Sequence, residues 1–202
     1  MLKENDKIVF FGDSITELGR QPNGYVTLIQ DTLARRHPGV RIIGAGISGN
    51  KVTDLLQRLE RDVLTSKPTI VFVYIGINDV WHSILPGHSG TTKDRYESGL
   101  TELVSSIRTA GARVILCTAS VIGERWDGKN PLDVQLEEYA AISRRVAREA
   151  GIELCDLRKA FIDYLTTHNP GKRESGILTQ DGVHLNDEGN RLVAHEMLKM
   201  LQ

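Results

Sequence analysis

Residues 8–15 read Ile-Val-Phe-Phe-Gly-Asp-Ser-Ile, so four large apolar residues lead directly into glycine, aspartate and serine. A short apolar run that is rich in β-branched and aromatic residues and ends at a turn signal is typical of a strand buried on both faces of a sheet. Gly12 permits the chain to bend tightly after such a strand. Similar runs occur at residues 41–44, 70–75, 114–118 and 152–155. These five runs are the predicted strands.

Longer amphipathic segments separate the predicted strands. Helical periodicity covers residues 25–36, 52–64, 93–110, 136–150, 157–167 and 187–201. Strands that alternate with helices at this spacing predict right-handed βαβ units and a parallel sheet. We therefore expect an α/β fold: a single domain over residues 1–202, with three α/β/α layers and a five-stranded parallel sheet of flavodoxin-like order 2-1-3-4-5.

Length and composition exclude several classes of function. The chain has 202 residues, of which 40% are hydrophobic and 25% charged, and its formal net charge is −1. A nearly neutral chain has no basic field for nucleic acid or an anionic membrane. The longest apolar stretch, residues 70–77, is too short to span a bilayer, and no signal-peptide pattern opens the chain. We expect a cytoplasmic protein without nucleic-acid or membrane partners, in which Cys117 and Cys155 are reduced thiols in buried strands.

Polar clusters follow the first three predicted strands. They read Gly-Asp-Ser-Ile at residues 12–15, Gly-Ile-Ser-Gly-Asn at 46–50 and Gly-Ile-Asn-Asp at 76–79. In the order 2-1-3 these strands are neighbours, and ligands of open α/β sheets bind at the carboxyl ends of the strands near the switch in order. A fourth cluster, Asp-Gly-Val-His at residues 181–184, precedes the last helix. The four clusters predict a site at this edge of the sheet.

Ser14 and His184 are the candidate nucleophile and base. A serine hydroxyl needs a base to remove its proton, and the segment after Ser14 can turn helical and direct free N–H groups at a developing anion. Asp181 precedes His184 by three residues across a glycine, so its carboxylate can hold Nδ1–H and leave Nε2 for the serine. Taken alone, Ser14 and Asp13 could be helix-capping residues, and the Asp-x-x-His spacing could be a surface turn or half of a metal site.

Gly49 and Asn78 are candidates for an oxyanion hole. Acyl transfer places negative charge on the carbonyl oxygen, and donors that are fixed before the reaction stabilise this charge. The Asn78 amide and the Gly49 N–H could join the Ser14 N–H in that role. Singly, Asn78 is better explained as a turn residue and Gly49 as a glycine at a helix entry, but the two together favour the oxyanion hole.

Two other chemistries are disfavoured. A metal site needs at least three ligands, and no His-x-His, Cys-x-x-Cys or His-Glu-x-x-His pattern supplies them. Residues 44–49 match the dinucleotide-binding pattern G-x-G-x-x-G, but the acidic residue expected about 20 positions later is missing. We therefore expect neither a metal nor a cofactor.

The four clusters together resemble the SGNH hydrolases, also called the GDSL esterase/lipase superfamily. The resemblance covers nearly the whole chain, and it implies that Ser14, Asp181 and His184 form the triad. It also implies that Ser14, Gly49 and Asn78 form the oxyanion hole. The chain departs from the pattern at residues 44–46, where many members carry an asparagine shortly before the Ile-Ser-Gly segment.

Within the superfamily, residues 46–50 and 76–81 look like those of intracellular carbohydrate acetylesterases. This resemblance implies a serine esterase that hydrolyses short-chain acyl esters, acetyl in particular, of a small-molecule or carbohydrate alcohol. Asp13, Tyr25, Trp81 and Trp126 would line the substrate pocket, although both tryptophans could instead pack loops. A thioesterase or acyltransferase with the same triad and a non-catalytic binding module are the alternatives.

Overall fold

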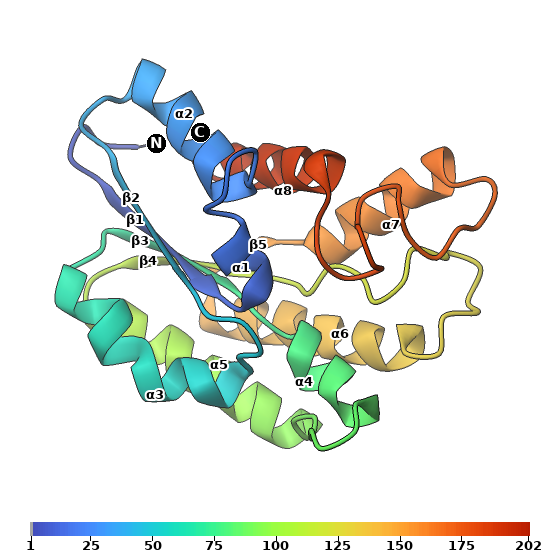
Figure 1. Cartoon of the computed structure of the whole chain (residues 1–202). Helices are drawn as coiled ribbons and strands as arrows, with labels where there is room; N and C mark the ends of the chain where they lie inside the picture. The colour runs from blue at the N-terminus through green and yellow to red at the C-terminus, as the bar shows by residue number, and fades with distance from the viewer. Residues whose placement is uncertain (1) are drawn as a thin grey trace.

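Residues 2–202 are described by a computed structural model, in which a five-stranded sheet lies between two layers of helices (Figure 1). The strand order is β2-β1-β3-β4-β5, and neighbouring strands pair in parallel. Helices α2, α7 and α8 cover one face of the sheet, and α3, α5 and α6 cover the other. The predicted fold class and strand order are confirmed.

The strands lie within two residues of their predicted positions. They are β1 Lys7–Gly12, β2 Arg41–Gly46, β3 Ile70–Tyr74, β4 Arg113–Cys117 and β5 Glu153–Cys155. Strands β1 and β3 are buried almost throughout, as expected for central strands. The prediction that all five strands are buried on both faces is wrong for β2 and β5. Most of their residues are only partly buried, because these strands lie at the two edges of the sheet.

The long helices also follow the predicted periodicity. The helices are α1 Ser14–Leu18, α2 Tyr25–Arg36, α3 Val52–Asp62, α4 Ile77–Trp81, α5 Lys93–Thr109, α6 Asp133–Ala150, α7 Leu157–His168 and α8 Asp187–Lys199, with 3₁₀ turns η1 Leu64–Ser66 and η2 His82–Ile84. Polar side chains cap several of their first turns: Thr92, Asp156 and Asn186 each accept a backbone N–H at the start of a helix. Helix α4 was not predicted, and α1 was expected only as a helical turn after Ser14, because five residues are too few to show a helical period.

The core is centred on β1 and β3 and on the helices that cover them. Phe10 stacks on Phe72 with ring centroids 5.0 Å apart, and Tyr25 meets the edge of Phe10 at 5.7 Å. Cys117 and Cys155 are both free and buried, as expected, and they are register partners in β4 and β5. No helix within residues 2–202 is long and apolar enough to cross a membrane. The cytoplasmic location stays a prediction.

Candidate active site

The ends of β1, β2 and β3 bring the first three polar clusters together. Gly12 is the register partner of both Gly46 and Tyr74, so the three strands end at the same level. Ser14 is the first residue of α1, and Asp13 caps this helix by accepting the Ile15 N–H at 3.0 Å. The turn between β1 and α1 is therefore built from residues that are adjacent in sequence.

His184 and Asp181 complete a chain of hydrogen bonds with Ser14. Ser14 Oγ lies 3.1 Å from His184 Nε2, and His184 Nδ1 lies 2.7 Å from Asp181 Oδ2. Asp181 Oδ1 also accepts the backbone N–H groups of Val183 at 3.0 Å and of His184 at 2.8 Å. Burial alone would raise the pKa of Asp181, but these hydrogen bonds hold it below its ordinary value. The carboxylate is thus ionised at neutral pH and can orient the imidazole.

The two predicted oxyanion donors follow the strands on either side of β1: Gly49 lies in the loop after β2, and Asn78 lies in α4, after β3. The Asn78 side chain is buried and donates one N–H to the Asn50 carbonyl at 3.0 Å, which fixes the amide and leaves its second N–H available. Gly49 has a positive φ of 78°, and a Cβ built there would meet no atom within 4 Å, so this residue borders open space. The loop after β2 and the start of α4 are therefore held together at this point.

Buried charges attach these loops to the sheet. The guanidinium of Arg58, on α3, donates to the Gly12 carbonyl at 2.6 Å, to the Ala45 carbonyl at 3.0 Å and to Asn50 Oδ1 at 2.6 Å. It also pairs with Asp62 at 3.0 Å. Arg58 thus links the end of β1 to the loop that follows β2.

Two buried carboxyl groups lie beneath the site. Burial, with the nearby Asp79 adding to it, raises the pKa of Asp13 to about 7. Burial raises the pKa of Asp79 to about 6, although its carboxylate accepts the Val52 N–H at 3.2 Å and so caps α3. These acids are placed to hold backbone rather than to meet a substrate.

Glu124 is a site component that the sequence did not reveal. Its carboxylate is fully buried and accepts the backbone N–H groups of Ile177 at 2.8 Å, Leu178 at 2.7 Å and Thr179 at 2.5 Å, together with the Thr179 hydroxyl at 2.7 Å. Thr179 Oγ1 in turn accepts the Gly182 N–H at 3.1 Å. Glu124 therefore fixes the segment that leads into Asp181 and His184. It stands in a polar loop without periodicity or motif, so no sequence signal marks it.

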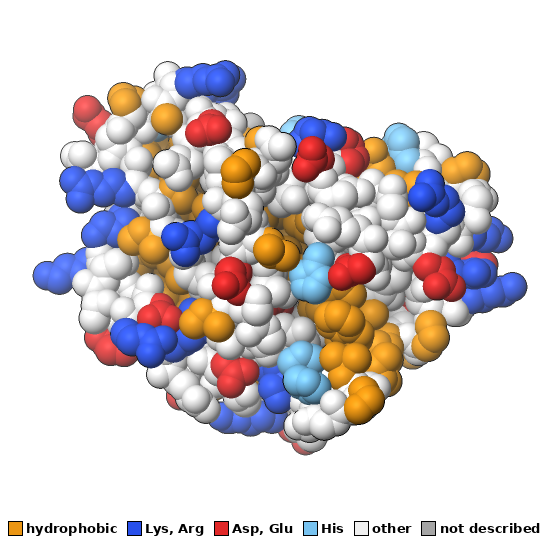
Figure 2. All heavy atoms as spheres, in the orientation of Figure 1, with side chains coloured by type: hydrophobic (Ala, Val, Ile, Leu, Met, Phe, Trp, Pro, Cys, Tyr) orange, Lys and Arg blue, Asp and Glu red, His pale blue; other side chains and the backbone are white. Residues whose placement is uncertain are grey.

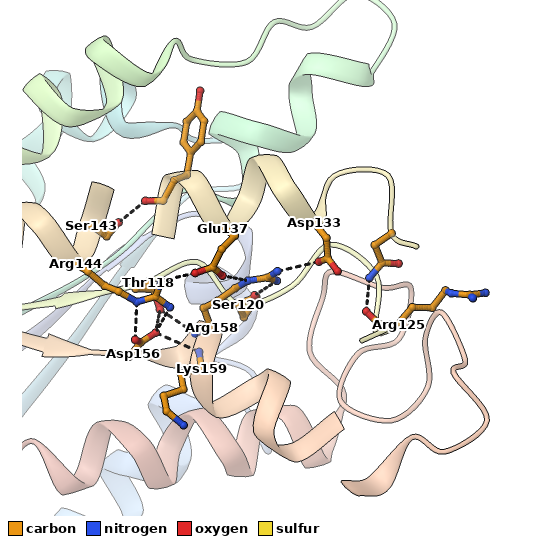
Figure 3. A network of polar contacts seen from close by, with 12 residues as sticks. Thr118, Ser120, Arg125, Asp133, Glu137, Ser143, Arg144, Asp156, Arg158 and Lys159 are labelled. Atoms are coloured by element: carbon orange, nitrogen blue, oxygen red, sulfur yellow. Dashed lines mark hydrogen bonds and ion pairs between the residues drawn. The ribbon is translucent and has the colours of Figure 1, made fainter. Parts of the chain in front are cut away.

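The loop that carries Glu124 is itself anchored by a polar network (Figure 3). Arg158, on α7, is almost fully buried and donates to the Ser120 carbonyl at 3.1 Å, to Asp133 at 2.9 Å and to Glu137 at 3.1 Å. Figure 3 shows these groups converging from α6, α7 and the segment after β4. The loop between β4 and α6 is thus tied down at both of its ends.

Of the four residues predicted to line the substrate pocket, the structure buries Tyr25 and Asp13, packs Trp126 against a loop and places only Trp81 beside His184. Tyr25 is fully buried, and its hydroxyl donates to Thr16 Oγ1 at 2.9 Å, so it packs the core. Asp13 is also buried and acts as a helix cap. Trp81 is partly buried, and its ring centroid lies 6.2 Å from that of His184. Trp126 instead contacts the segment after α7: its Nε1–H donates to the Asn169 carbonyl at 2.9 Å, which is a loop-packing role.

The glycine pattern at residues 44–49 has a packing explanation. A Cβ on Gly46 would lie 2.1 Å from the Glu17 nitrogen, because α1 crosses directly over the end of β2. Gly46 therefore serves the close packing of α1 on β2. Within residues 2–202, no group of three or more histidine, cysteine, aspartate or glutamate residues is arranged to hold a metal ion.

The profile of the GDSL-like Lipase/Acylhydrolase family matches residues 10–192. The chain belongs to this family. A sequence relative, the acetylxylan esterase of Geobacillus stearothermophilus, is 32% identical over 96% of this chain and 93% of its own length. The isoamyl acetate-hydrolyzing esterase 1 homolog of Rattus norvegicus is 26% identical over 96% of this chain and 81% of its own length.

Solved structures agree with these sequence relatives. The crystal structure of an acetyl xylan esterase, AlAXEase, superposes with a TM-score of 0.94 and 41% identity, covering 97% of this GDSL-family chain and all of the other. The chain is an esterase of this family, and the comparisons do not favour the thioesterase, acyltransferase or binding-module alternatives. Its acetylesterase relatives support hydrolysis of acetyl esters.

Proposed function

We propose that the chain is a serine esterase that removes acetyl groups from the hydroxyls of small carbohydrates, with Ser14, His184 and Asp181 as its triad. The observation that carries this proposal is the continuous hydrogen-bond chain from Ser14 Oγ to His184 at 3.1 Å and on to Asp181 at 2.7 Å. Relatives support it, because the Geobacillus acetylxylan esterases in which a serine or a histidine is replaced by alanine are known as catalytic mutants.

In the proposed reaction His184 Nε2 takes the Ser14 proton while Ser14 Oγ attacks the acetyl carbonyl carbon. The carbonyl oxygen becomes an anion that receives hydrogen bonds from the Ser14 and Gly49 N–H groups and from the free N–H of Asn78. The imidazolium then returns the proton to the departing sugar alcohol, leaving an acetyl-serine. Water, deprotonated by His184, hydrolyses this intermediate and releases acetate.

The carbohydrate part of the proposal has two supports. Acetyl xylan esterases stand among both the sequence relatives and the structural neighbours. Trp81 also lies next to the His184 ring, with an interplanar angle of 69°, and is partly buried against the core. An aromatic ring at this place offers an apolar face to a sugar ring, while the triad attacks its ester.

Replacement of the nucleophile tests the mechanism. We expect Ser14→Ala to lower kcat on 4-nitrophenyl acetate by roughly 10³–10⁶, because the remaining groups lack a nucleophile to form the acyl-enzyme. A fluorophosphonate probe should label the wild type and the control Ser98→Ala, whose serine is exposed on α5, but not Ser14→Ala. Labelling of folded Ser14→Ala, or a tenth of wild-type turnover, would disprove the assignment.

A further inference from the structure

A polar cavity lies on the side of the site where Gly49 is exposed. It is a shallow cavity, open to solvent on one side, and it measures about 410 Å³. One wall is the loop after β2, and the other is the turn that follows α4. The side chains and backbone that shape it include Ser48, Gly49, Lys51, Asp54, His82 and His88.

Two histidines give this cavity its hydrogen-bonding character. The rings of His82 and His88 lie with their centroids 4.7 Å apart, and His82 is only 8% exposed whereas His88 is exposed. The His82 ring forms no hydrogen bond to residues 2–202. The His82 nitrogens are not among the fully enclosed side-chain atoms that lack a partner in residues 2–202, so they keep some contact with solvent, and the residue lines the cavity.

The charge around the histidines suits a neutral ligand rich in hydroxyls. Burial, together with His88 and Lys51, lowers the pKa of His82, so its ring is neutral and offers one donor and one acceptor. The Lys51 ammonium is engaged by the Ser89 carbonyl at 2.9 Å, and the Asp54 carboxylate accepts the Lys51 N–H at 2.8 Å. The cavity therefore contains one positive and one negative group, both with partners, beside two free imidazoles.

Helix α4 and Gly49 connect the cavity to the proposed triad. Helix α4 carries Asn78 near its start and Trp81 at its end, and His82 is the next residue. Trp81 lies beside His184, while Gly49 belongs both to the cavity wall and to the proposed oxyanion hole. Figure 2 shows histidine side chains on one face of the molecule with hydrophobic surface between them. A chain of two sugar rings could thus extend from the triad over Trp81 into the cavity.

We propose that this cavity is a subsite for the sugar residue next to the acetylated one, with His82 and His88 hydrogen-bonding to its hydroxyl groups. The proposal rests on the carbohydrate acetylesterase function proposed above. It assigns to the two histidines the preference for an oligosaccharide over a single sugar. The chemistry at Ser14 does not depend on them.

Three substrates separate the subsite from the catalytic machinery. They are 4-nitrophenyl acetate, which tests hydrolysis alone, an acetylated methyl xyloside, which adds one sugar, and acetylated xylobiose, which adds the second. The variants are His82→Gln, His88→Ala and the double replacement. His195→Gln, at an exposed histidine on α8, is the matched control.

We expect the double variant to raise KM for acetylated xylobiose about tenfold, the effect of losing one to two neutral hydrogen bonds, with kcat little changed. His88→Ala should show part of this effect without disturbing the fold, because the ring is exposed. Both smaller substrates should be hydrolysed as by the wild type.

Equal losses on all three substrates would overturn the subsite and show that the histidines only support the fold. An unchanged KM for acetylated xylobiose would overturn it as well, while Ser14-dependent hydrolysis of the sugar esters would keep the proposed function intact. A wild type that hydrolyses 4-nitrophenyl acetate but neither sugar ester would refute the carbohydrate function itself, and the subsite with it.

Discussion

Ser14 lies on a short turn between β1 and α1, whereas His184 lies on a turn between two helices that belongs to no strand of the sheet. The Ser14 turn is held by its own neighbours: the Asp13 side chain caps α1, and the Glu17 N–H donates to the Asp13 carbonyl at 2.9 Å. Near His184 the chain forms a single isolated bridge, between Thr179 and Leu185. The Asp181 carboxylate also accepts the Val183 and His184 N–H groups. The segment that leads into this turn, however, is held by a residue more than 50 positions earlier, Glu124.

This difference shows that contacts close in sequence position Ser14, whereas contacts distant in sequence position His184. Local hydrogen bonds and sheet register hold Ser14, the proposed nucleophile, so a short sequence block contains most of the necessary information. The segment before His184, the proposed base, depends on a buried carboxylate that satisfies three backbone N–H groups at once, and such groups are costly to leave without partners. The orientation of His184 should therefore be more sensitive to distant substitutions than the position of Ser14.

The largest effect is expected from the triad turn itself. His184→Ala should lower kcat by roughly 10³–10⁶, because the serine loses its base. Asp181→Asn should cost less, since the carboxylate orients the ring rather than accepting the proton. Steady-state kinetics on 4-nitrophenyl acetate, with a thermal melt to confirm folding, provides the measurement. A greater loss in Asp181→Asn than in His184→Ala would contradict these roles.

On the nucleophile side, Asn78→Ala should lower kcat by about 10²–10³ and leave KM nearly unchanged, because its hydrogen bond matters most once the carbonyl oxygen is charged. Asn78→Asp should be worse, since it places a negative charge where the anion forms. Both variants should be compared with the wild type by kinetics and by thermal unfolding. If folded Asn78→Ala keeps kcat within threefold, Asn78 is only a turn residue.

Replacing two buried charged residues, Glu124 near His184 and Arg58 near Ser14, tests the difference between the two turns directly. Glu124→Gln should lower kcat by about 10²-fold, the scale of a small misplacement of a catalytic group, because an amide cannot accept all the donors that the carboxylate accepts. Arg58→Met should lower kcat by only about tenfold, since the Ser14 turn keeps its cap and its sheet register. Both variants should lose stability, by about 1–3 kcal/mol for each buried group that is left without a partner.

Glu174→Gln is the matched control for Glu124, because its side chain is exposed and only its backbone carbonyl meets the Glu124 N–H, at 2.9 Å. The readouts are kcat, the rate of fluorophosphonate labelling and the free energy of unfolding in urea. A Glu124→Gln enzyme that is destabilised but retains its kcat would show that the segment stabilises the fold without positioning His184. A greater loss of kcat in Arg58→Met than in Glu124→Gln would show that Ser14, rather than His184, depends more on distant residues.

The smallest effect concerns the pH dependence of stability. Burial raises the pKa of Asp13 from 3.8 to about 7, so between these pH values the folded protein keeps a proton that the unfolded chain has lost. This group therefore makes the fold less stable as pH rises from about 4 to 7. Asp13→Asn retains a cap oxygen but cannot ionise. The free energy of unfolding of the variant, relative to that of the wild type, should therefore increase as pH rises from about 4 to 7. Parallel curves from urea titrations at pH 4.5, 6 and 7.5 would contradict this.

Some misreadings of the sequence have a common physical cause. Tyr25 starts an amphipathic helix, and its side chain turns inward to Thr16 and Phe10, which no local pattern reveals. Helices α1 and α4 are too short to show periodicity, although they carry Ser14 and Asn78. Glu124 lies in a polar loop, where a carboxylate is ordinarily exposed, and only its distant partners make it a buried acceptor.

The sequence by itself determined the strands and the four polar clusters, because burial patterns and turn residues act over a few positions. It determined the strand order as well, because the rules of βαβ connection allow few arrangements. It also determined the family resemblance, and with it the proposed triad. Only the tertiary structure decided that Ser14 and His184, 170 positions apart, meet at 3.1 Å. It alone also decided that Glu124 holds the segment before the proposed base and that His82 lines a cavity. These outcomes depend on which side chains meet after packing, and long-range contacts of this kind leave no periodic signal in a single chain.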